Sequence, residues 1–552
     1  MLTSRPLGLS ALTWSANAAE MMYSTAASHG NAAALIEGGQ AVTYAALAGR
    51  AGAIAQTVAN AVSPGERVAI FLRRGTDAAA AFFGVLAAGA VAVIVNETLR
   101  SRQIEHILKH ADTSLLLTSA ELCSHLSRLP DDHVAAIDVA DIAPVHDFEP
   151  VPRVGADVAQ IVYTSGSTGL PKGVTLSHSN LWAGMSAVVS YLGITPTDRI
   201  VSLLPFSFDY GLNQLLCCAG TGAALVVERS PVPQRIIETV RRERVSILPA
   251  VPPLWLQLLG VTALRKPLPS LRLMTNTGGH LPIHAVHKLR VNQPHADLVL
   301  MYGLTEAFRS TYLASEAVVR KPSSIGRAIP GAEILVLDES CRPCGPGQFG
   351  QLVHRGPTVA LGYWNDPDAT AARFRPHPLR PAGASDVERV VFSGDLVYRD
   401  EDGDLFFVGR HDTMIKTLGY RVSPDEVADV LYASGEVLEA VVVSESDEER
   451  GARIVVYVVL TDGGDARQLA AFCARELPRY MQPSRIEVRT ELPRTTSGKH
   501  DAAAAAYPDR GAAMPTPGPG GAGGDATGAA QEGDVQAEAS TATAQSDVGH
   551  LR

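Results

Sequence analysis

The sequence is poor in charged residues, in aromatic residues and in cysteine. Of its 552 residues, 19% are charged and 6% are aromatic, and the formal net charge is -10. A chain with this charge is not a nucleic-acid binder held by bulk electrostatics. No uncharged apolar run approaches the ~18 residues that a membrane helix needs, so we expect no membrane span. Hydrophobic residues still make up 46% of the chain, which suffices for large buried cores.

The six cysteines are too sparse in so long a chain to predict a disulfide framework. Cys341 and Cys344 form a lone CxxC pair, and a zinc ribbon would need a second pair that the sequence does not have. Proline and glycine flank the lone pair, which favours a surface turn. We therefore expect no disulfide scaffold.

The N-terminus resembles a secretory signal, but its apolar stretch is short and interrupted by Ser10, and the alanine-rich pattern runs on to Ala34. We therefore expect a cytoplasmic enzyme.

The last part of the chain, residues 509–552, differs in composition from the rest. It is rich in glycine, alanine, proline, serine and threonine, and it contains no Phe, Trp, Tyr or Ile. Such a segment buries too little apolar surface to offset the entropy that ordering would cost. We therefore predict a disordered low-complexity tail.

The body of the chain has the pattern of an α/β protein. Short apolar runs at 67–72, 91–95 and 114–117 have the length of buried strands, and helical stretches at 76–86 and 100–110 lie between them. Strands that alternate with helices predict parallel sheets with right-handed crossovers.

The sequence also predicts how the body divides into domains. Near residue 350, glycine and proline begin to separate much shorter strands, and after Gly409 a smaller unit of helices and strands follows. We predict a large domain over 1–409, built of parallel α/β subdomains and a short-stranded β subdomain. A small mobile α+β domain is predicted over 410–508.

The strongest local signal is the loop YTSGSTGLPKG at 163–173, which follows an apolar strand at 158–162. Its glycines allow a tight turn whose N–H groups face an anion, and its hydroxyl and lysine side chains add donors and charge. It is not a Walker A loop, because its lysine follows proline and precedes glycine. Rather than a polar surface loop, we predict a phosphate site formed by Thr164, Ser165, Gly166, Ser167, Thr168, Gly169 and Lys172.

Four further segments follow this loop along the chain. They read MYGLTE (301–306), SGDL (393–396), GRHDTMIK (409–416) and PRTTSGK (493–499). Together with the loop, they resemble the signatures of the adenylate-forming superfamily, which contains acyl-CoA synthetases, adenylation domains of nonribosomal peptide synthetases and beetle luciferases. The resemblance covers residues 15–505. Within the superfamily, the chain is most similar to bacterial AMP-forming acyl-CoA ligases of the exosortase-associated type.

The resemblance implies a nucleotide site. The implied contacts are Tyr302, Gly278 and Gly279 for the adenine, Asp395 for both ribose hydroxyls, and Arg410 for the ribose or phosphate. His280 departs from the family, which often has alanine after the two glycines. A Gly-Asp pair such as 394–395 is by itself more typical of a turn, but the order of the motifs favours the nucleotide site.

The resemblance also implies ATP and Mg²⁺ as cofactors and a reaction in two steps. Glu306 would hold Mg²⁺, a hard cation that prefers oxygen ligands, and Thr305 would touch the phosphate. Lys499 would reach the reacting carboxylate and the α-phosphate. The small domain would then turn about a hinge at Asp412 and bring in Lys416 for the attack of a thiol.

The acid substrate depends on the acyl pocket, where FSFDY lies at 206–210. We predict Phe208 and Asp209 as substrate residues. Amino-acid adenylation domains pair an Asp at this position with the substrate's ammonium group, and a buried carboxylate needs such a cation. Alternatively, Asp209 only caps a helix expected over 210–218. Arg309 could bind a second acid group, but we favour a surface position for it.

We therefore predict an AMP-forming acid–thiol ligase that acts on a small carboxylic or amino acid. It would form an acyl- or aminoacyl-adenylate with release of pyrophosphate, and then a thioester with CoA. The alternative is a stand-alone amino-acid adenylation enzyme that loads the phosphopantetheine of a separate acyl or peptidyl carrier protein, since no serine-centred carrier site follows Lys499. A more remote alternative is a non-catalytic nucleotide-binding scaffold. Loss of Lys499, Glu306 or Asp395 would favour it, and all three are present.

Removal of the tail is expected to leave the enzyme intact. A chain truncated after Pro508 should keep the melting temperature and turnover of the full chain, because residues 509–552 lack core-forming side chains. Thermal unfolding and an assay of pyrophosphate release from ATP check this. A large fall in either quantity would show that the tail packs on the body or regulates it.

Overall fold

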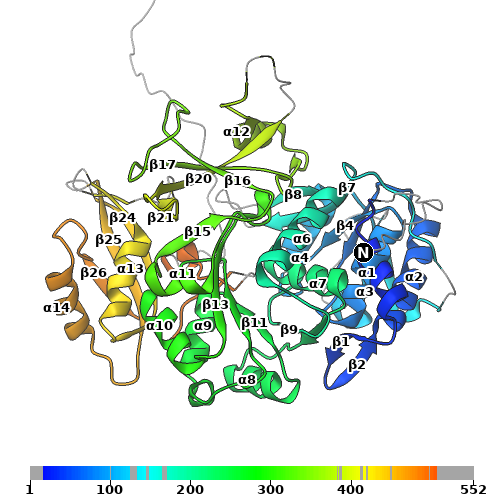
Figure 1. The fold of residues 1–552 in the computed structure, drawn as a ribbon, viewed down its shortest axis with the longest axis horizontal. Helices are drawn as coiled ribbons and strands as arrows, with labels where there is room; N and C mark the ends of the chain where they lie inside the picture. The colour runs from blue at the N-terminus through cyan, green and yellow to red at the C-terminus, as the bar shows by residue number, and fades with distance from the viewer. Residues whose placement is uncertain are drawn as a thin grey trace, which may run out of the picture. The chain divides into compact units, whose positions relative to one another are not determined.

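The computed structural model describes most of the chain up to residue 506. The described residues are 16–99, 101–124, 134–144, 148–164, 171–381, 383, 388–410, 415–417, 420–447, 451–495 and 498–506. Contacts divide the chain into two compact units, residues 1–506 and 507–552. All elements labelled in Figure 1 belong to the first unit. The predicted boundary between residues 409 and 410 falls inside that unit and stays a prediction, and the predicted tail lies outside the described residues.

A seven-stranded sheet contains the first strands of the α/β pattern, in the order β18-β8-β7-β4-β3-β5-β6. Its strands are β3 (Arg67–Ile70), β4 (Val91–Ile94), β5 (Thr113–Thr118), β6 (Ala135–Asp138), β7 (Val158–Thr164), β8 (Lys172–Ser177) and β18 (Gly362–Tyr363). β3 to β7 pair in parallel, whereas β8 pairs antiparallel with both β7 and β18. Thr164 and Lys172 are directly opposite each other in this sheet, at the two ends of the predicted phosphate loop.

The helices of this region are α2 (Tyr44–Ala61), α3 (Thr76–Ala87), α4 (Ser101–His110) and α5 (Ala120–Cys123). Small residues allow α2 and α3 to pack very closely. Every residue of α3 from Ala78 to Ala87 is buried. A Cβ on Gly84 would lie 2.7 Å from the carbonyl oxygen of Ala51 and 3.0 Å from the side chain of Ile54. The alanine and glycine content of this region is therefore a packing requirement.

A 14-stranded sheet joins a parallel half to an antiparallel half. The parallel half has β1 (Ala33–Glu37), β9 (Arg199–Ser202), β10 (Ala224–Val227), β11 (Ile247–Ala250), β12 (Leu273–Asn276) and β13 (Asp297–Tyr302), with β2 (Gln40–Thr43) antiparallel at its edge. The antiparallel half has β14 (Thr311–Leu313), β15 (Ser324–Ala328), β16 (Glu333–Leu337), β17 (Gly350–Arg355), β19 (Phe374–Pro376), β20 (Arg389–Arg399) and β21 (Leu405–Arg410). The direction changes between β13 and β14, next to the motif at 301–306. Ligands of open α/β sheets bind beyond the carboxyl ends of parallel strands, so this topology places the motif at a favoured position.

The remaining helices up to residue 410 are α1 (Glu20–His29), α6 (His178–Leu192), α7 (Asp209–Thr221), α8 (Pro233–Arg242), α9 (Pro252–Leu259), α10 (Ile283–Asn292), α11 (Ser315–Arg320) and α12 (Pro367–Arg373). Short 3₁₀ turns are η1 (Val139–Asp141), η2 (Thr262–Arg265) and η3 (Thr305–Ala307). No described helix combines the length and the apolar character that crossing a membrane requires.

The chain after residue 415 forms a smaller set of elements. These are β22 (Ile415–Thr417), β23 (Tyr420–Val422), α13 (Pro424–Ala433), β24 (Val437–Asp447), β25 (Gly451–Leu460), α14 (Ala466–Glu476), β26 (Arg485–Val488) and α15 (Ala502–Ala506). β24, β25 and β26 form a sheet of their own. Val427 and Leu431 of α13 belong to the same hydrophobic cluster as Leu256 of α9 and Val286 of α10. This segment is therefore packed against the helices of the large sheet.

The predicted fold class is confirmed. The helix predicted over 76–86 is α3, and the strand predicted over 114–117 is β5. The parallel α/β subdomains, the short strands after residue 350 and the α+β segment at the end are all present. The lone Cys341–Cys344 pair lies between β16 and β17, and both cysteines are free.

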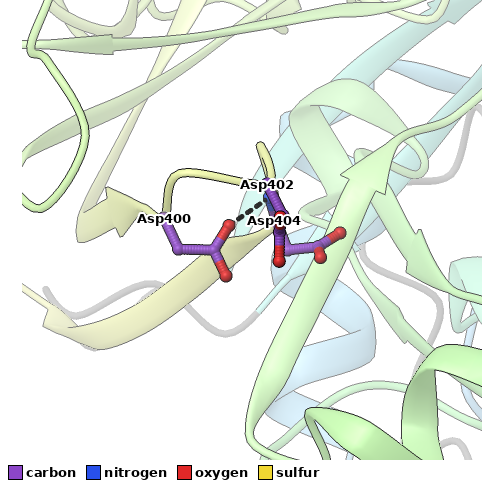
Figure 2. A group of neighbouring side chains, drawn as sticks. All are labelled: Asp400, Asp402 and Asp404. Atoms are coloured by element: carbon purple, nitrogen blue, oxygen red, sulfur yellow. Dashed lines mark hydrogen bonds between the residues drawn. The ribbon is translucent and has the colours of Figure 1, made fainter.

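Three carboxylates gather at the turn between β20 and β21, and Figure 2 shows that they lie close together. They belong to Asp400, Asp402 and Asp404. The ammonium group of Lys321 donates to all three, at 2.6, 2.7 and 2.8 Å, and Arg327 donates to Asp404 at 2.8 Å. A protein cation therefore occupies the place where a metal ion would sit.

Replacing Lys321 by methionine is expected to lower the melting temperature by several degrees, because the three carboxylates would repel one another without their cation. Lys321→Arg keeps the charge and should recover most of the loss. Thermal unfolding without nucleotide measures both. Added EDTA should leave the unmodified protein unchanged, and a fall in its melting temperature would show instead that the cluster holds a metal ion.

Candidate active site

The predicted ribose site is formed by neighbours on two paired strands. Asp395 on β20 is directly opposite Arg410 on β21, and Arg410 Nε lies 3.7 Å from Asp395 Oδ1. The hydroxyl of Tyr302, at the end of β13, donates to Asp395 Oδ2. Burial and the Asp395 carboxylate raise the pKa of Tyr302 well above its ordinary value, so Tyr302 remains a neutral donor. Gly394 and Asp395 lie within β20 and not in a turn.

The predicted magnesium ligand and the end of the phosphate loop share one neighbour, Tyr363 of β18. The Tyr363 hydroxyl donates to Glu306 Oε1 at 2.5 Å. Lys172 Nζ lies 5.3 Å from the centre of the Tyr363 ring and 3.5 Å from Asp366 Oδ2. Tyr363 lies outside the predicted motifs, and sequence reasoning missed it because β18 is far along the chain from β8, with which it pairs.

Lys499, near the end of the described chain, lies against the large sheet's loops. Its Nζ is 5.7 Å from the centre of the Phe208 ring. A Cβ on Gly278 would lie 3.2 Å from Lys499 Cε, and Gly278 has a φ of +85°. Glycine therefore meets both a spatial and a backbone requirement at this position.

The charges around Lys499 come from both predicted subsites. Burial lowers the pKa of Lys499, Asp209 opposes that shift, and Arg410 and Arg309 reinforce it. Asp395 also opposes it. Lys499 therefore interacts at once with the predicted ribose site and the predicted acid pocket.

A buried glutamate of β24 fixes the segment that carries Lys499. Arg494 Nη2 donates to Glu439 Oε1 at 2.6 Å, and His500 Nε2 lies 3.2 Å from Glu439 Oε2. Thr495 N donates to the carbonyl oxygen of Lys499 at 2.7 Å, which closes the turn. Burial would raise the pKa of Glu439, but His500 and Arg494 together lower it. Sequence reasoning missed Glu439, because its partners lie 55 and 61 residues away.

Asp209 is buried and is the first residue of α7. The N-cap position belongs to Phe208, and Asp209 Oδ1 accepts from the N–H of Tyr210 at 2.8 Å. Asp209 thus lies within the helix and not at its cap, although its carboxylate binds an N–H of the first turn. A Cβ on Gly211 would collide with the Pro205 carbonyl oxygen, so glycine is needed for the entry into α7.

The expected surface position of Arg309 is wrong, because its side chain is only 2% exposed. Its guanidinium carbon lies 5.1 Å from the centre of the Tyr210 ring. The physical reason is a sharp turn at Phe308, whose φ is +59°, between η3 and β14. That turn, which the sequence pattern does not reveal, directs Arg309 inward.

The structure describes only part of the remaining predicted site. Ser165, Gly166, Ser167, Thr168, Gly169 and Asp412 lie outside the described residues. Thr305 begins η3, directly before Glu306. Lys416 is the middle residue of β22. Gly279 is exposed, and a Cβ on it would lie 3.3 Å from the Pro252 ring.

His280, which departs from the family at its position, connects the loop after β12 to α13. Its Nε2 lies 2.9 Å from Asp429 Oδ1. Burial alone would lower the pKa of His280, but the hydrogen bond to Asp429 and the charges of Asp429 and Asp425 raise it overall. The contact ties the segment that carries Lys499 to the large sheet.

Comparison with known proteins gives two matching family models and many similar sequences. Residues 22–364 match the model described as AMP-binding enzyme, and residues 426–499 match its C-terminal domain. The chain is 32% identical over 511 residues to novobiocin biosynthesis protein H of Streptomyces niveus, covering 89% of this chain and 82% of that protein. It is 32% identical over 483 residues to one of the linear gramicidin synthase proteins of Brevibacillus parabrevis. That match covers 85% of this chain but only 9% of the synthase protein.

Solved structures give the same fold. The o-succinylbenzoate CoA synthetase of Bacillus subtilis, in complex with its acyl-adenylate, is 26% identical with a TM-score of 0.76, covering 87% of this chain and 96% of that one. The same enzyme has been solved with ATP and a magnesium ion. The anthranilate CoA ligase AuaEII with anthranoyl-AMP, at 24% identity and a TM-score of 0.79, covers 89% of this chain and 96% of its own and shares the fold.

Replacing His280 by alanine is expected to destabilise the protein mainly at low pH. The ion pair raises the pKa of His280, so its contribution is complete below about pH 6.5 and is lost as the pH rises through the raised pKa. Because both side chains are partly exposed, the effect is about 1 kcal/mol or less. Thermal unfolding of both proteins across this pH range measures it. His287→Ala, at an exposed position of α10, is the control, and the same pH dependence in both variants would contradict the expectation.

Proposed function

The chain belongs to the AMP-binding enzyme family, and we propose that it is an AMP-forming acid–thiol ligase of the acyl-CoA synthetase type. In this proposal, it forms an acyl- or aminoacyl-adenylate from ATP and a carboxylic acid, and then transfers the acyl group to CoA. The observation that carries the proposal is the position of Lys499. Its side chain lies against Phe208 and Gly278, where its charge interacts with those of Asp209 and Asp395.

In the first step, a carboxylate oxygen of the acid attacks the α-phosphorus of ATP, the bond to pyrophosphate breaks and pyrophosphate leaves. The acid's carboxylate is itself the nucleophile, so the enzyme needs none of its own. Because the carboxylate and the triphosphate are both anions, the enzyme must hold them in line and supply positive charge between them. Lys499 supplies charge where carboxylate and α-phosphate meet. Asp395 is proposed to accept the ribose hydroxyls, with Tyr302 and Arg410 fixing its orientation.

Glu306 fits a magnesium ion, because Mg²⁺ prefers carboxylate and phosphate oxygens. Tyr363 donates to one oxygen of Glu306 and thereby orients the carboxylate. When bound, Mg²⁺ would neutralise part of the triphosphate charge. The ammonium group of Lys172 lies near the ring of the same Tyr363, and we propose that it acts on the same phosphates.

In the second step, a thiol sulfur attacks the acyl carbon and AMP leaves. We propose that Lys416 on β22 and Gly419, which lies outside the described residues, enter the site for this step after rotation about Asp412. CoA is the proposed acceptor. The rotation would remove Lys499 from the site. In this proposal, the contacts of Glu439 and His280 in the structure belong to the conformation used for the first step.

A second candidate is a stand-alone amino-acid adenylation enzyme that loads a separate carrier protein. The observation that favours it is the buried carboxylate of Asp209 at the start of α7, which suits the ammonium group of an amino acid. Thioester formation with CoA, compared with a phosphopantetheinylated carrier protein, separates the two candidates. The scaffold alternative is not favoured, because Lys499, Glu306 and Asp395 all have defined partners.

The two lysines are expected to separate the half-reactions. A transition-state charge contact is worth roughly 3 kcal/mol, or two to three decades in rate. Lys499→Ala should therefore lose adenylate formation but still convert supplied acyl-adenylate and thiol into thioester. Lys416→Ala should still form adenylate and fail at thioester formation. Single-turnover kinetics with purified adenylate measure both steps.

Lys266→Ala, at an exposed position, is the control for loss of a lysine. It should leave both steps unchanged. If Lys499→Ala and Lys416→Ala each lose both steps equally, a rotating segment is not used and one fixed site must perform all the chemistry.

A further inference from the structure

Arg309 is a buried cation whose side chain contacts the rings of Tyr210 and Phe308 but pairs with no carboxylate among the described residues. Its Nε and Nη2 atoms have no hydrogen-bond partner, and among the described residues it takes part in no ion pair. A buried arginine is normally paired, because removing an unpaired charge from water is costly. Arg272, which is only partly buried, is paired in this way, since its Nε donates to the buried carboxylate of Asp198 at 2.7 Å.

The backbone is bent unfavourably to bring Arg309 inside. Arg309 N donates to the Ala307 carbonyl oxygen at 2.6 Å, and Phe308 between them has a φ of +59°. These features define a three-residue γ-turn of the rare, strained kind. A Cβ on Gly184 would collide with the Phe308 ring, so α6 leaves space for this conformation. Strain of this kind persists mostly where function requires it.

A row of contacts leads from Lys499 to Arg309. Lys499 Nζ lies 5.7 Å from the centre of the Phe208 ring, and the Phe208 and Tyr210 rings lie 6.4 Å apart at right angles. The Arg309 guanidinium carbon lies 5.1 Å from the centre of the Tyr210 ring. Phe208 and Tyr210 thus link the two cations, which are close enough for their charges to interact, and Arg309 contacts the helix that begins at Asp209.

A second donor shares a neighbour with Arg309, because the Cys217 thiol that donates to Asn213 also lies within reach of the Arg309 charge. Asn213 lies one turn after Asp209 on α7, is buried, and has an Nδ2 atom without a hydrogen-bond partner. Its Oδ1 is already used, because it accepts from Cys217 Sγ at 3.7 Å. The unpartnered atoms Nε and Nη2 of Arg309 and Nδ2 of Asn213 are all donors. These three donors would be satisfied by a negatively charged acceptor. A carboxylate is such an acceptor, and its two oxygens match the geometry of the guanidinium group.

We propose that the acid activated by this enzyme carries a second carboxylate, and that Arg309 binds that carboxylate together with Asn213. The inference rests on the proposed function, in which the reacting carboxylate lies at Lys499. Plain dicarboxylic acids and acidic amino acids share this chemistry. In an acidic amino acid, the ammonium group would pair with Asp209.

ATP–pyrophosphate exchange with acids of matched length tests the inference. Succinate, glutarate and adipate are compared with butyrate, valerate and hexanoate, and L-aspartate and L-glutamate with L-2-aminobutyrate and L-norvaline. For at least one pair, kcat/KM should be about a hundredfold higher for the diacid. Arg309→Met should bring that ratio close to one, and Arg309→Lys should keep part of it. Asp209→Asn separates the two sources, because it should weaken exchange with an amino diacid far more than with a plain diacid.

Melting temperatures separate binding from folding. Arg309→Met removes an unpaired buried charge and should keep or raise the melting temperature of the free protein. Arg272→Met is the matched control, because it leaves the buried carboxylate of Asp198 unpaired and should lower the melting temperature. A saturating diacid without ATP should raise the melting temperature of the unmodified protein and not that of Arg309→Met.

Equal exchange with diacids and monoacids would overturn the inference and leave the proposed function intact. A fall in the melting temperature of Arg309→Met, with equal loss for all acids, would also overturn it by assigning Arg309 to folding alone. A diacid-dependent shift in melting temperature without exchange would support the inference and contradict the proposed function.

Discussion

The contacts of the candidate site depend on one charge, the ammonium group of Lys499. This group comes from near the end of the described chain and is buried in the site. Burial lowers the pKa of Lys499, and the carboxylates of Asp209 and Asp395 oppose that shift by stabilising the charged form. A Cβ on Gly278 would crowd the lysine side chain at 3.2 Å, so glycine at this position favours its entry. The glutamate of β24, Glu439, then holds the two residues that flank the lysine's turn.

The same requirement explains the contacts between the end of the chain and the large sheet. α13 shares a hydrophobic cluster with α9 and α10, and the ion pair of His280 with Asp429 connects the same elements. The hydrophobic contacts are independent of pH, whereas the ion pair weakens as His280 loses its proton. The arrangement that we propose for adenylation is thus held by hydrophobic contacts that do not depend on pH and by an ion pair that does.

The sequence predicts the fold class and most elements, because the apolar runs and helical stretches are local patterns. The strand predicted over 114–117 is slightly longer in the structure, where β5 runs from Thr113 to Thr118. The motifs also point to Glu306, Asp395 and Lys499 as candidates. Their partners could not be predicted, because Tyr363 and Glu439 reach them only through the tertiary fold. The burial of Arg309 could not be predicted either, because a γ-turn at Phe308 leaves no trace in an apolar pattern.

The central step of the proposed reaction is the attack of a carboxylate oxygen of the acid on the α-phosphorus of ATP. The most direct measurement supplies an accepted acid with ¹⁸O in both carboxylate oxygens, with ATP, Mg²⁺ and CoA, and determines the mass of the nucleotide product. The account predicts AMP that carries one ¹⁸O atom from the acid. Unlabelled AMP, or ¹⁸O in inorganic phosphate, would contradict it.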